Sequence, residues 1–421
     1  MSLLQFLLMV VALLFAVIIL RLLPATQRSL AAGTESAIDK INKCVNTITA
    51  KVGPDGRANQ LSQFESRAIS SSGIASGFGV SNPFTTTDEA QARKFVNQAR
   101  RSMNTAKLEE LSEMARKDIQ SFLANDPENG VSLASLVQIV TLSMALRVFI
   151  KDGIASTNLD QSRLLIISNF INKIWIDSKF PERRIVYREY HELHDALRAI
   201  CPQYDPLDPR ENPLNWLLPS FESLWRIALR TFLEVKFSTG RMHPEWSRAL
   251  IKFARNPTKE QFEGFFESQS VHQGQTRISV QEIVNEALRL YPPTRHIYRA
   301  FQFDPGDRQN EIADIESLHI DPDIWGVDAL KFDPERWNKL SDLQRKAFMP
   351  FGGEPFRCPA KLAFGPRAIA LVAGVVLAAF EGGDWHMECD DSQVMEDLNR
   401  GTRLSLSRDG YTNVVLRRCS E

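Results

Sequence analysis

A cysteine in a tight turn, followed at once by an apolar helix, constrains this chain more than any other feature. The text PFGGEPFRCPA (350–360) surrounds Cys358 with Gly and Pro, and the apolar segment GPRAIALVAGVVLAAF (365–380) follows it. That segment is too short to span a bilayer, so we expect a buried core helix. Backbone N–H groups at a helix start can point at a thiolate and lower its basicity. The sequence therefore predicts one chemically special thiol beside the core.

Composition excludes several classes of protein. The 421 residues are 43% hydrophobic and 24% charged, which predicts a folded chain with a sizeable core. Lys and Arg number 50 and Asp and Glu 51, so no net basic field points to nucleic acid. The five cysteines are widely spaced and form no CxxC pair. This pattern argues against a disulfide scaffold and against a structural zinc site.

The N-terminal text predicts a membrane anchor. Residues 3–20 read LLQFLLMVVALLFAVIIL, in which Gln5 is the only polar residue. Extended to Leu23, this run would span about 30 Å as a helix at roughly 1.5 Å per residue. A cleaved signal peptide is the alternative, but the run is long for a signal core and no basic residue precedes it. Arg21 and Arg28 follow it, which places the body of the protein in the cytosol.

The remaining chain is mostly helical in pattern. Apolar residues recur at helical spacing from about residue 88 onward, and VSLASLVQIVTLSMALRVFI is apolar on nearly all sides. Helices are expected from about 88 and over 131–150, 160–178, 181–200, 213–235, 279–290 and 365–380.

Other segments read as loops or strands. Residues 24–60 are polar and predict a linker, and the Gly/Ser-rich 70–83 predicts an irregular segment. HIYRAF, TRLSLS and NVVLRR read as short strands. The predicted fold class is mainly α with minor β, as one domain over 61–421 behind the anchor at 1–23.

Two further motifs precede the cysteine turn. EALR places Glu286 and Arg289 on one helix face, and HIDPDIWGVDALKFDPERW (319–337) follows. Alone, the first reads as a solvated ion pair, and the cysteine turn reads as a loop with an incidental thiol. In this order, with Glu286 and Cys358 72 residues apart, the three segments resemble the cytochrome P450 family. The resemblance covers about 88–421 and is most specific over 279–375.

The resemblance implies a fold and a cofactor. Cys358 looks like the thiolate ligand of a haem iron, which donates electron density to the metal and favours O–O cleavage. Phe351 would pack against the loop and shield the sulfur. Glu286, Arg289 and Arg336 would form a buried charged network with a structural role, and losing any member should be severe.

The haem loop departs from the family pattern. The family usually has Gly four residues before the cysteine, Arg two before it and Gly two after it. This chain has Glu354, Phe356 and Ala360 at those positions. Arg357 is the candidate that would compensate as a haem-propionate partner.

Other propionate partners are implied by position. His296 and Arg299 lie in PPTRHIYR, and Arg100 or Arg101 lies in FVNQARR, where an exposed basic helix face is the alternative. The family's usual Trp on that early helix has no clear counterpart here, and Phe95 is the nearest aromatic residue.

The helix aligned with the family's oxygen-activating helix is also altered. Its text PSFES places Glu222 beside Ser223, and such an acid–hydroxyl pair can relay protons through water. The alternative is a helix cap with an incidental Glu. Pro219 should bend this helix, because it removes one N–H donor and clashes with the preceding turn.

The resemblance implies a membrane-bound enzyme. It predicts a haem-thiolate monooxygenase of a lipophilic small molecule, supplied with electrons from NADPH by a cytochrome P450 reductase. Its place would be the endoplasmic reticulum, single-pass, with the catalytic domain in the cytosol. The haem loop and LLPSFESLWR are similar to filamentous-fungal members, which often act in secondary metabolism. Two alternatives remain open: a haem-thiolate isomerase, dehydratase or cyclase that uses no external oxygen, and a non-catalytic haem-binding protein.

Overall fold

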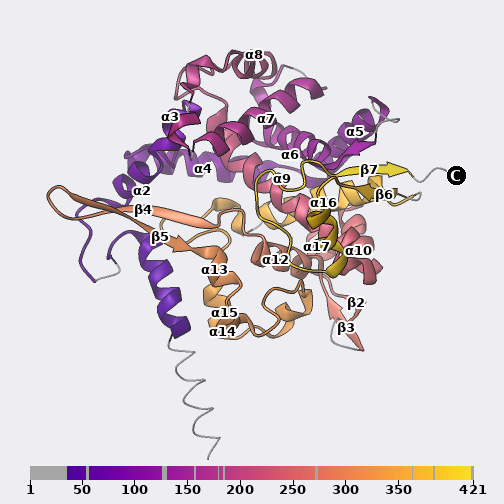
Figure 1. Ribbon diagram of the computed structural model, residues 1–421. Coiled ribbons are helices and arrows are strands. Elements are labelled where there is room, and N and C mark those ends of the chain that lie inside the picture. Colours follow the sequence, from indigo (N-terminus) through magenta and orange to yellow (C-terminus); the bar gives the residue numbers. More distant parts are fainter. Residues whose placement is uncertain are drawn as a thin grey trace, which may run out of the picture.

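The computed structural model describes residues 36–418 except 54–55, 126–129, 156–157, 179, 184, 271–273, 363 and 383–384. Its helices surround a central group of buried helices, and small sheets lie at the edges (Figure 1). The helices from residue 63 onward are α2 (Gln63–Ser70), α3 (Ser72–Phe78), α4 (Glu89–Thr105), α5 (Leu108–Asn125), α6 (Leu133–Phe149), α7 (Gln161–Asp177), α8 (His191–Ile200), α9 (Leu214–Phe237), α10 (Pro244–Arg255), α11 (Lys259–Glu263), α12 (Val280–Leu290), α13 (Ile315–His319), α14 (Pro322–Trp325), α15 (Asp342–Ala347), α16 (Phe364–Ala379) and α17 (Ser392–Arg400).

All the sheets are antiparallel and small. Strands β4 (His296–Asp304) and β5 (Asp307–Asp314) form a long hairpin, with His296 opposite Asp314. Strand β7 (Val415–Arg418) lies between β1 (Val131–Ser132) and β6 (Trp385–Glu388), and β2 (Phe266–Gln269) pairs with β3 (Gln275–Ile278). The class predicted from sequence, mainly α with minor β, is confirmed.

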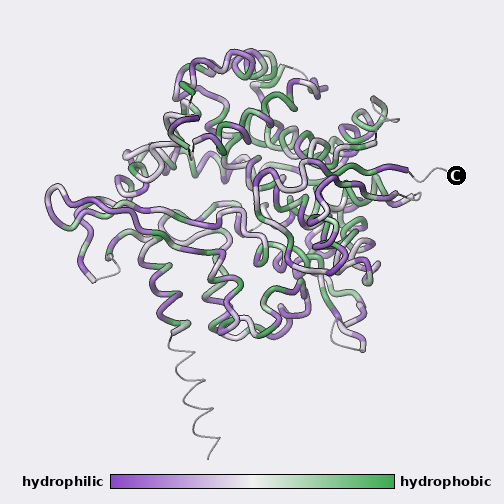
Figure 2. Tube along the Cα trace, viewed as in Figure 1, coloured by the Kyte–Doolittle hydropathy of each residue, from purple (hydrophilic) through white to green (hydrophobic). Residues whose placement is uncertain are grey.

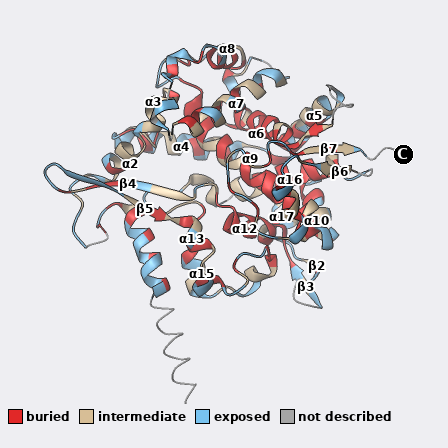
Figure 3. Ribbon diagram, viewed as in Figure 1, coloured by how far each residue is buried: buried red, intermediate tan, exposed pale blue. Residues whose placement is uncertain are grey.

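The core is built on α6, α9 and α16. Helix α6 is buried on nearly every side, as its apolar text predicts, and α16 is buried from Ala368 to Leu377. The buried residues of Figure 3 and the apolar residues of Figure 2 both concentrate on these central helices. Helix α16 is therefore a core helix, and it begins directly after the cysteine turn and runs into the packed interior.

Three local expectations are wrong. The segment 70–83 contains helix α3, which ends because Gly79 adopts a left-handed φ of 57°. Within 181–200, only α8 is α-helical, and short 3₁₀ turns precede it. TRLSLS forms no strand, because arginine side chains rather than a neighbouring strand bind its carbonyls at Ser405 and Leu406.

The expected linker contains a packed helix. Residues 36–49 are helical, and Ala37, Ile41 and Ile48 are buried against a cluster that includes Trp325. Because polar residues separate these apolar positions, the sequence did not indicate that one face of this helix is buried. The predicted anchor at 1–23 lies outside the described residues. Among the residues that the structure does describe, no helix combines the length and apolar character needed to cross a bilayer.

A buried charged network joins α12 to the segment that precedes the cysteine turn. Arg289 forms two hydrogen bonds with Glu286, at 2.7 and 2.9 Å, and both side chains are fully buried. The Nε atom of Arg336 lies 3.4 Å from the same carboxylate, and the Trp337 indole donates to it at 3.0 Å. The structural network predicted from the motifs is confirmed.

The network also fixes the charge state of its carboxylate. Burial alone raises the pKa of Glu286, but Arg289 and Arg336 outweigh burial, so the pKa lies below its usual value. A carboxylate with a depressed pKa in the folded state stabilises the fold at neutral pH, and this contribution is lost as pH falls through that pKa.

Arg289→Ala should destabilise the protein strongly. The substitution leaves the Glu286 carboxylate buried with fewer partners, and breaking a buried pair of this kind costs about 3–5 kcal/mol. Denaturant unfolding measures the change. Arg93→Ala is the control, because Arg93 pairs with Glu89 on the exposed face of α4 and should change stability by about 0.5 kcal/mol or less. Equal stability of Arg289→Ala and wild type would contradict the account.

Candidate haem-binding site

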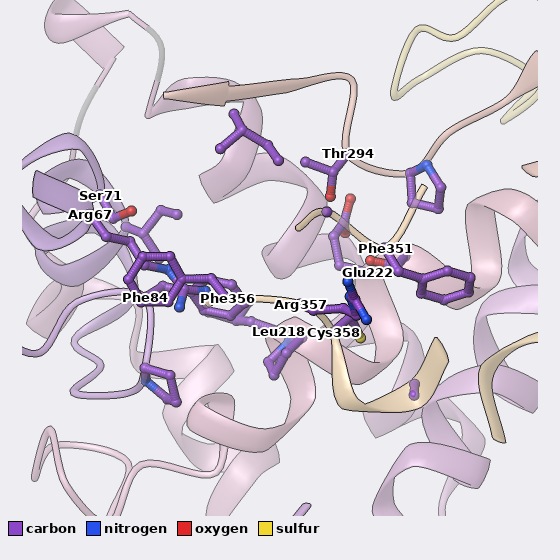
Figure 4. Close-up of a pocket in the computed structure, with 18 of the residues that line it drawn as sticks. Arg67, Ser71, Phe84, Leu218, Glu222, Thr294, Phe351, Phe356, Arg357 and Cys358 are labelled. Atoms are coloured by element: carbon purple, nitrogen blue, oxygen red, sulfur yellow. The ribbon is translucent and has the colours of Figure 1, made fainter. Parts of the chain in front are cut away.

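A large cavity lies where the cysteine turn meets α9. Its volume is about 2140 Å³, and residues of α2, α4, α9, β4 and the cysteine turn line it. Cys358, Phe351 and Phe356 of the cysteine turn line it together with Glu222 of α9, and Figure 4 shows these residues in close-up. The cavity is larger than the roughly 300–1,000 Å³ of an ordinary ligand pocket. It has room for a prosthetic group and a second molecule.

The turn that carries Cys358 is closed by its own backbone. The Cys358 N–H donates to the Phe351 carbonyl at 2.9 Å, and Gly352 supplies a left-handed φ of 65° between them. At Gly365 a side chain would meet the Ala360 carbonyl at 3.0 Å and the Phe351 ring at 3.2 Å. The loop thus needs glycine where it turns and where it enters α16, and it holds the thiol in one place.

The electrostatic surroundings of the thiol are mixed. Burial raises the pKa of Cys358, while the Ala360 N–H and the charge of Arg67 act in the opposite direction. A bound metal ion would supply the further positive charge that keeps a thiolate deprotonated.

A buried histidine connects the charged network to the cysteine turn. The Met349 N–H donates to Nε2 of His319 at 2.9 Å, so the ring proton lies on Nδ1 and is donated to the Arg289 carbonyl at 3.1 Å. Burial lowers the pKa of His319 to about 3, so the ring is neutral. The start of the turn is thereby fixed to α12.

Two cations face the cavity without a carboxylate partner. The Arg67 guanidinium lies 4.5 Å from the ring centres of both Phe84 and Phe356, and Arg299 lies 5.1 Å from that of Phe356. Within the part of the chain that the structure describes, neither arginine forms an ion pair. Burial lowers the pKa of Arg67 to about 9, and the charge of Arg299 adds to this shift. A dianionic ligand would neutralise both cations.

The other predicted propionate partners lie differently. Arg357 and His296 line the cavity, but Arg357 is exposed and lies 3.4 Å from Glu354, and His296 lies 3.6 Å from Asp314 across the hairpin. Arg101 is exposed on α4 and is not among the residues that line the cavity. Arg100 is exposed on α4. The sequence analysis did not identify Arg67, which is the only one of these cations on α2. The residues next to it in the sequence form no motif that indicates anion binding.

Aromatic rings form another part of the wall. The Phe95 ring stacks on the Trp216 indole with centres 3.9 Å apart, and Phe149 lies 6.1 Å from the same indole. Phe149 in turn contacts Phe364, the first residue of α16. Phe95, the aromatic residue singled out on the early helix, therefore belongs to an apolar wall suited to a flat macrocycle or an apolar ligand.

The predicted acid–hydroxyl pair lines the cavity from α9. Oε1 of Glu222 accepts from Arg408 and lies 3.6 Å from Nη1 of Arg226, whereas its Oε2 is buried with no partner among the described residues. Ser223 is partly exposed and also lines the cavity. The free carboxylate oxygen is the atom of this pair that can accept or donate a proton.

The comparisons with known proteins agree with this geometry. The family model described as Cytochrome P450 matches residues 275–362. Cytochrome P450 71A19 from Arabidopsis thaliana is 22% identical over 74% of this chain and 70% of its own length. Cytochrome P450 monooxygenase apdE from Emericella nidulans is 53% identical, over 11% of this chain and 8% of its own.

Solved structures agree on the fold. The crystal structure of a mutant haem domain of cytochrome P450DA aligns with a TM-score of 0.52 at 14% identity, and the alignment covers 83% of this chain and 81% of that one. The family and fold imply a haem whose iron is bound by cysteine, and Cys358 is the only cysteine within the matched residues 275–362. The cavity volume, the single thiol and the two unpaired cations fit this group. This chain therefore has the cytochrome P450 fold, and its residues 275–362 match the Cytochrome P450 family model.

Proposed function

We propose that the protein is a haem-thiolate monooxygenase of a lipophilic small molecule. One observation carries the proposal: the sole cysteine of the matched segment lines a cavity whose wall holds two unpaired arginines. A bound haem supplies oxygen-activating redox chemistry. A non-catalytic haem protein would not need an acid with a free oxygen in the same cavity.

Each part of the wall then has a task. Cys358 holds the iron, and Phe351 covers the thiolate from the loop side. Arg67 and Arg299 bind the propionates, with Phe356 as the platform under both guanidinium groups. The family places an arginine at the position of Phe356, so Arg67 restores the missing charge from another helix. The role first expected of Arg357 passes to Arg67 in this proposal.

The α9 pair controls protons. Oε2 of Glu222, which has no partner among the described residues, is the oxygen that would accept a proton and release it into the cavity, and Ser223 would pass it on directly or through water. The Phe95–Trp216 stack is an apolar part of the same cavity wall, and in this proposal it would limit the entry of bulk water.

Electron supply and location complete the proposal. Electrons reach the protein from NADPH through a cytochrome P450 reductase, and the apolar run 3–23 anchors the chain in the endoplasmic reticulum with the catalytic domain in the cytosol. The proposed role lies in fungal secondary metabolism, and the short match to the Emericella nidulans protein supports the monooxygenase part of this proposal.

Product formation should require both NADPH and oxygen, and Glu222→Gln should uncouple the two. The variant keeps the shape of the side chain but removes the titratable oxygen, so we expect product formation to fall about 10²–10⁴-fold while peroxide rises. Ser223→Ala should have a milder effect, because water can replace a hydroxyl. NADPH consumption, product and peroxide are measured together.

Ser220→Ala is the matched control for these variants. Ser220 lines the same cavity one turn away, but its hydroxyl donates to the Trp216 carbonyl at 2.6 Å, so coupling should stay at the wild-type value. Unchanged coupling in Glu222→Gln would contradict the relay. Product made by wild type without oxygen and NADPH would replace the monooxygenase with the isomerase-type alternative.

Deletion of residues 1–23 should release the protein from membranes. The truncation removes the apolar run but leaves the helix at 36–49, which packs on the domain, so folding should persist. Membrane and supernatant fractions are compared by immunoblot after alkaline extraction. A mature N-terminus downstream of the apolar run in the full-length protein would instead support a cleaved signal.

A further inference from the structure

A second group of cations lies around Glu222 of α9, and three of its arginines, Arg226, Arg295 and Arg408, line the cavity. Five arginines gather around two carboxylates near the irregular segment 403–408. The arginines are Arg226, Arg230, Arg295, Arg403 and Arg408, and the carboxylates are Glu222 and Glu316.

The two carboxylates are shared. Glu222 forms ion pairs with both Arg226 and Arg408. Glu316 forms ion pairs with Arg295 at 2.5 Å and with Arg403 at 2.8 Å. In the regions that the structure describes, no third carboxylate pairs with this group, so positive charge remains in excess. Buried charge in excess is costly unless a ligand compensates it.

Part of this positive charge has a structural task. Arg230 donates to the carbonyls of Ser405 and Ser407 at 3.0 Å each, and to that of Arg226 at 3.1 Å. Its guanidinium also lies over the Tyr411 ring. Arg230 therefore holds the segment 403–408 to α9, and it does not line the cavity.

Arg226 and Arg408 do line the cavity. Arg226 is 5% exposed, and its Nε has no partner among the described residues. Among the described residues, its hydrogen bond to the 403–408 segment is a long one of 3.4 Å to the Leu406 carbonyl. An unsatisfied, buried N–H on a charged group that faces a cavity is an incomplete anion site.

The neighbouring charges support the same conclusion. Burial lowers the pKa of Arg408 to about 10, Glu222 opposes this shift, and the charges of Arg226 and Arg295 add to it. Asp409 also lines the cavity, but it is exposed and forms no ion pair with this group in the described part of the chain. Arg226 and Arg408 therefore share the Glu222 carboxylate and repel each other, and Arg295 adds to this repulsion.

We propose that the substrate is an apolar organic acid whose carboxylate binds Arg226 and Arg408, with Arg295 nearby. The carboxylate fills the free donor of Arg226 and lowers the repulsion among the arginines. The aromatic wall of Phe95 and Trp216 takes the apolar part of the same molecule. This substrate class rests on the proposed function of the cavity as a substrate site.

Decanoate and decan-1-ol are the probes, because they differ only in the charged group. Isothermal titration calorimetry on haem-loaded protein measures binding without turnover. Wild type should bind decanoate at least about tenfold more tightly than decan-1-ol. Arg226→Met and Arg408→Met should each bring that ratio close to one while leaving the affinity for decan-1-ol unchanged.

Arg93→Met is the matched control. Arg93 lines the same cavity but is exposed and paired with Glu89, so the variant should keep the wild-type ratio. If Arg226→Met does not fold, the ratio measured for Arg408→Met tests the proposal instead. Among the described residues, Arg408 donates to no carbonyl of the 403–408 segment, so its loss should not disturb that segment. A ratio near one in wild type, or an equal loss in Arg93→Met, would overturn the proposal.

The same samples separate this inference from the proposed function. The reduced carbon-monoxide spectrum is recorded before ligand is added. A normal thiolate-type spectrum with no preference for decanoate overturns the anion site and leaves the monooxygenase standing. A sample without that spectrum overturns both.

Discussion

The fully buried pair of Glu286 and Arg289 is the contact on which the site depends. Arg289 also donates to the carbonyls of His319 and Ala329 at 2.8 and 2.7 Å, so one guanidinium gathers several loop segments around α12. His319 then binds the backbone of Met349, directly before the cysteine turn. The position of the thiol therefore depends on a charged pair that does not line the cavity. This structural role explains why the chain keeps a buried ion pair although its desolvation is costly.

The placement of positive charge explains how an altered haem loop can still suit a haem. The chain has Phe356 where the family has an arginine, and the structure sets Arg67 over that ring from α2. The positive charge of this region therefore comes from Arg67 on α2, and the Phe356 ring packs against its guanidinium group. A second set of arginines around Glu222 lies on α9 and the 403–408 segment. In our proposals the first group would bind the haem propionates and the second group a distinct anionic ligand.

Sequence reasoning was most accurate where periodicity was strong. The helices α6, α7, α9, α12 and α16 were predicted to within a few residues, because their apolar spacing or composition is unambiguous. The motif order also predicted the buried network and the cysteine turn. Two kinds of feature could not be predicted from the sequence. The helix at 36–49 was read as a linker because charged residues separate its buried positions, and the roles of Arg67 and Arg408 depend on side chains that meet across long sequence separations.

The central claim is that Cys358 is the thiolate that binds the haem iron. The direct test compares the reduced carbon-monoxide difference spectra of purified wild type, Cys358→Ser and Cys389→Ser. Cys389 is the matched control, because it is also a partly buried free thiol but lies outside the cavity. The account predicts the thiolate-type band in wild type and Cys389→Ser and its loss in Cys358→Ser. A Cys358→Ser protein that keeps the wild-type band would contradict it.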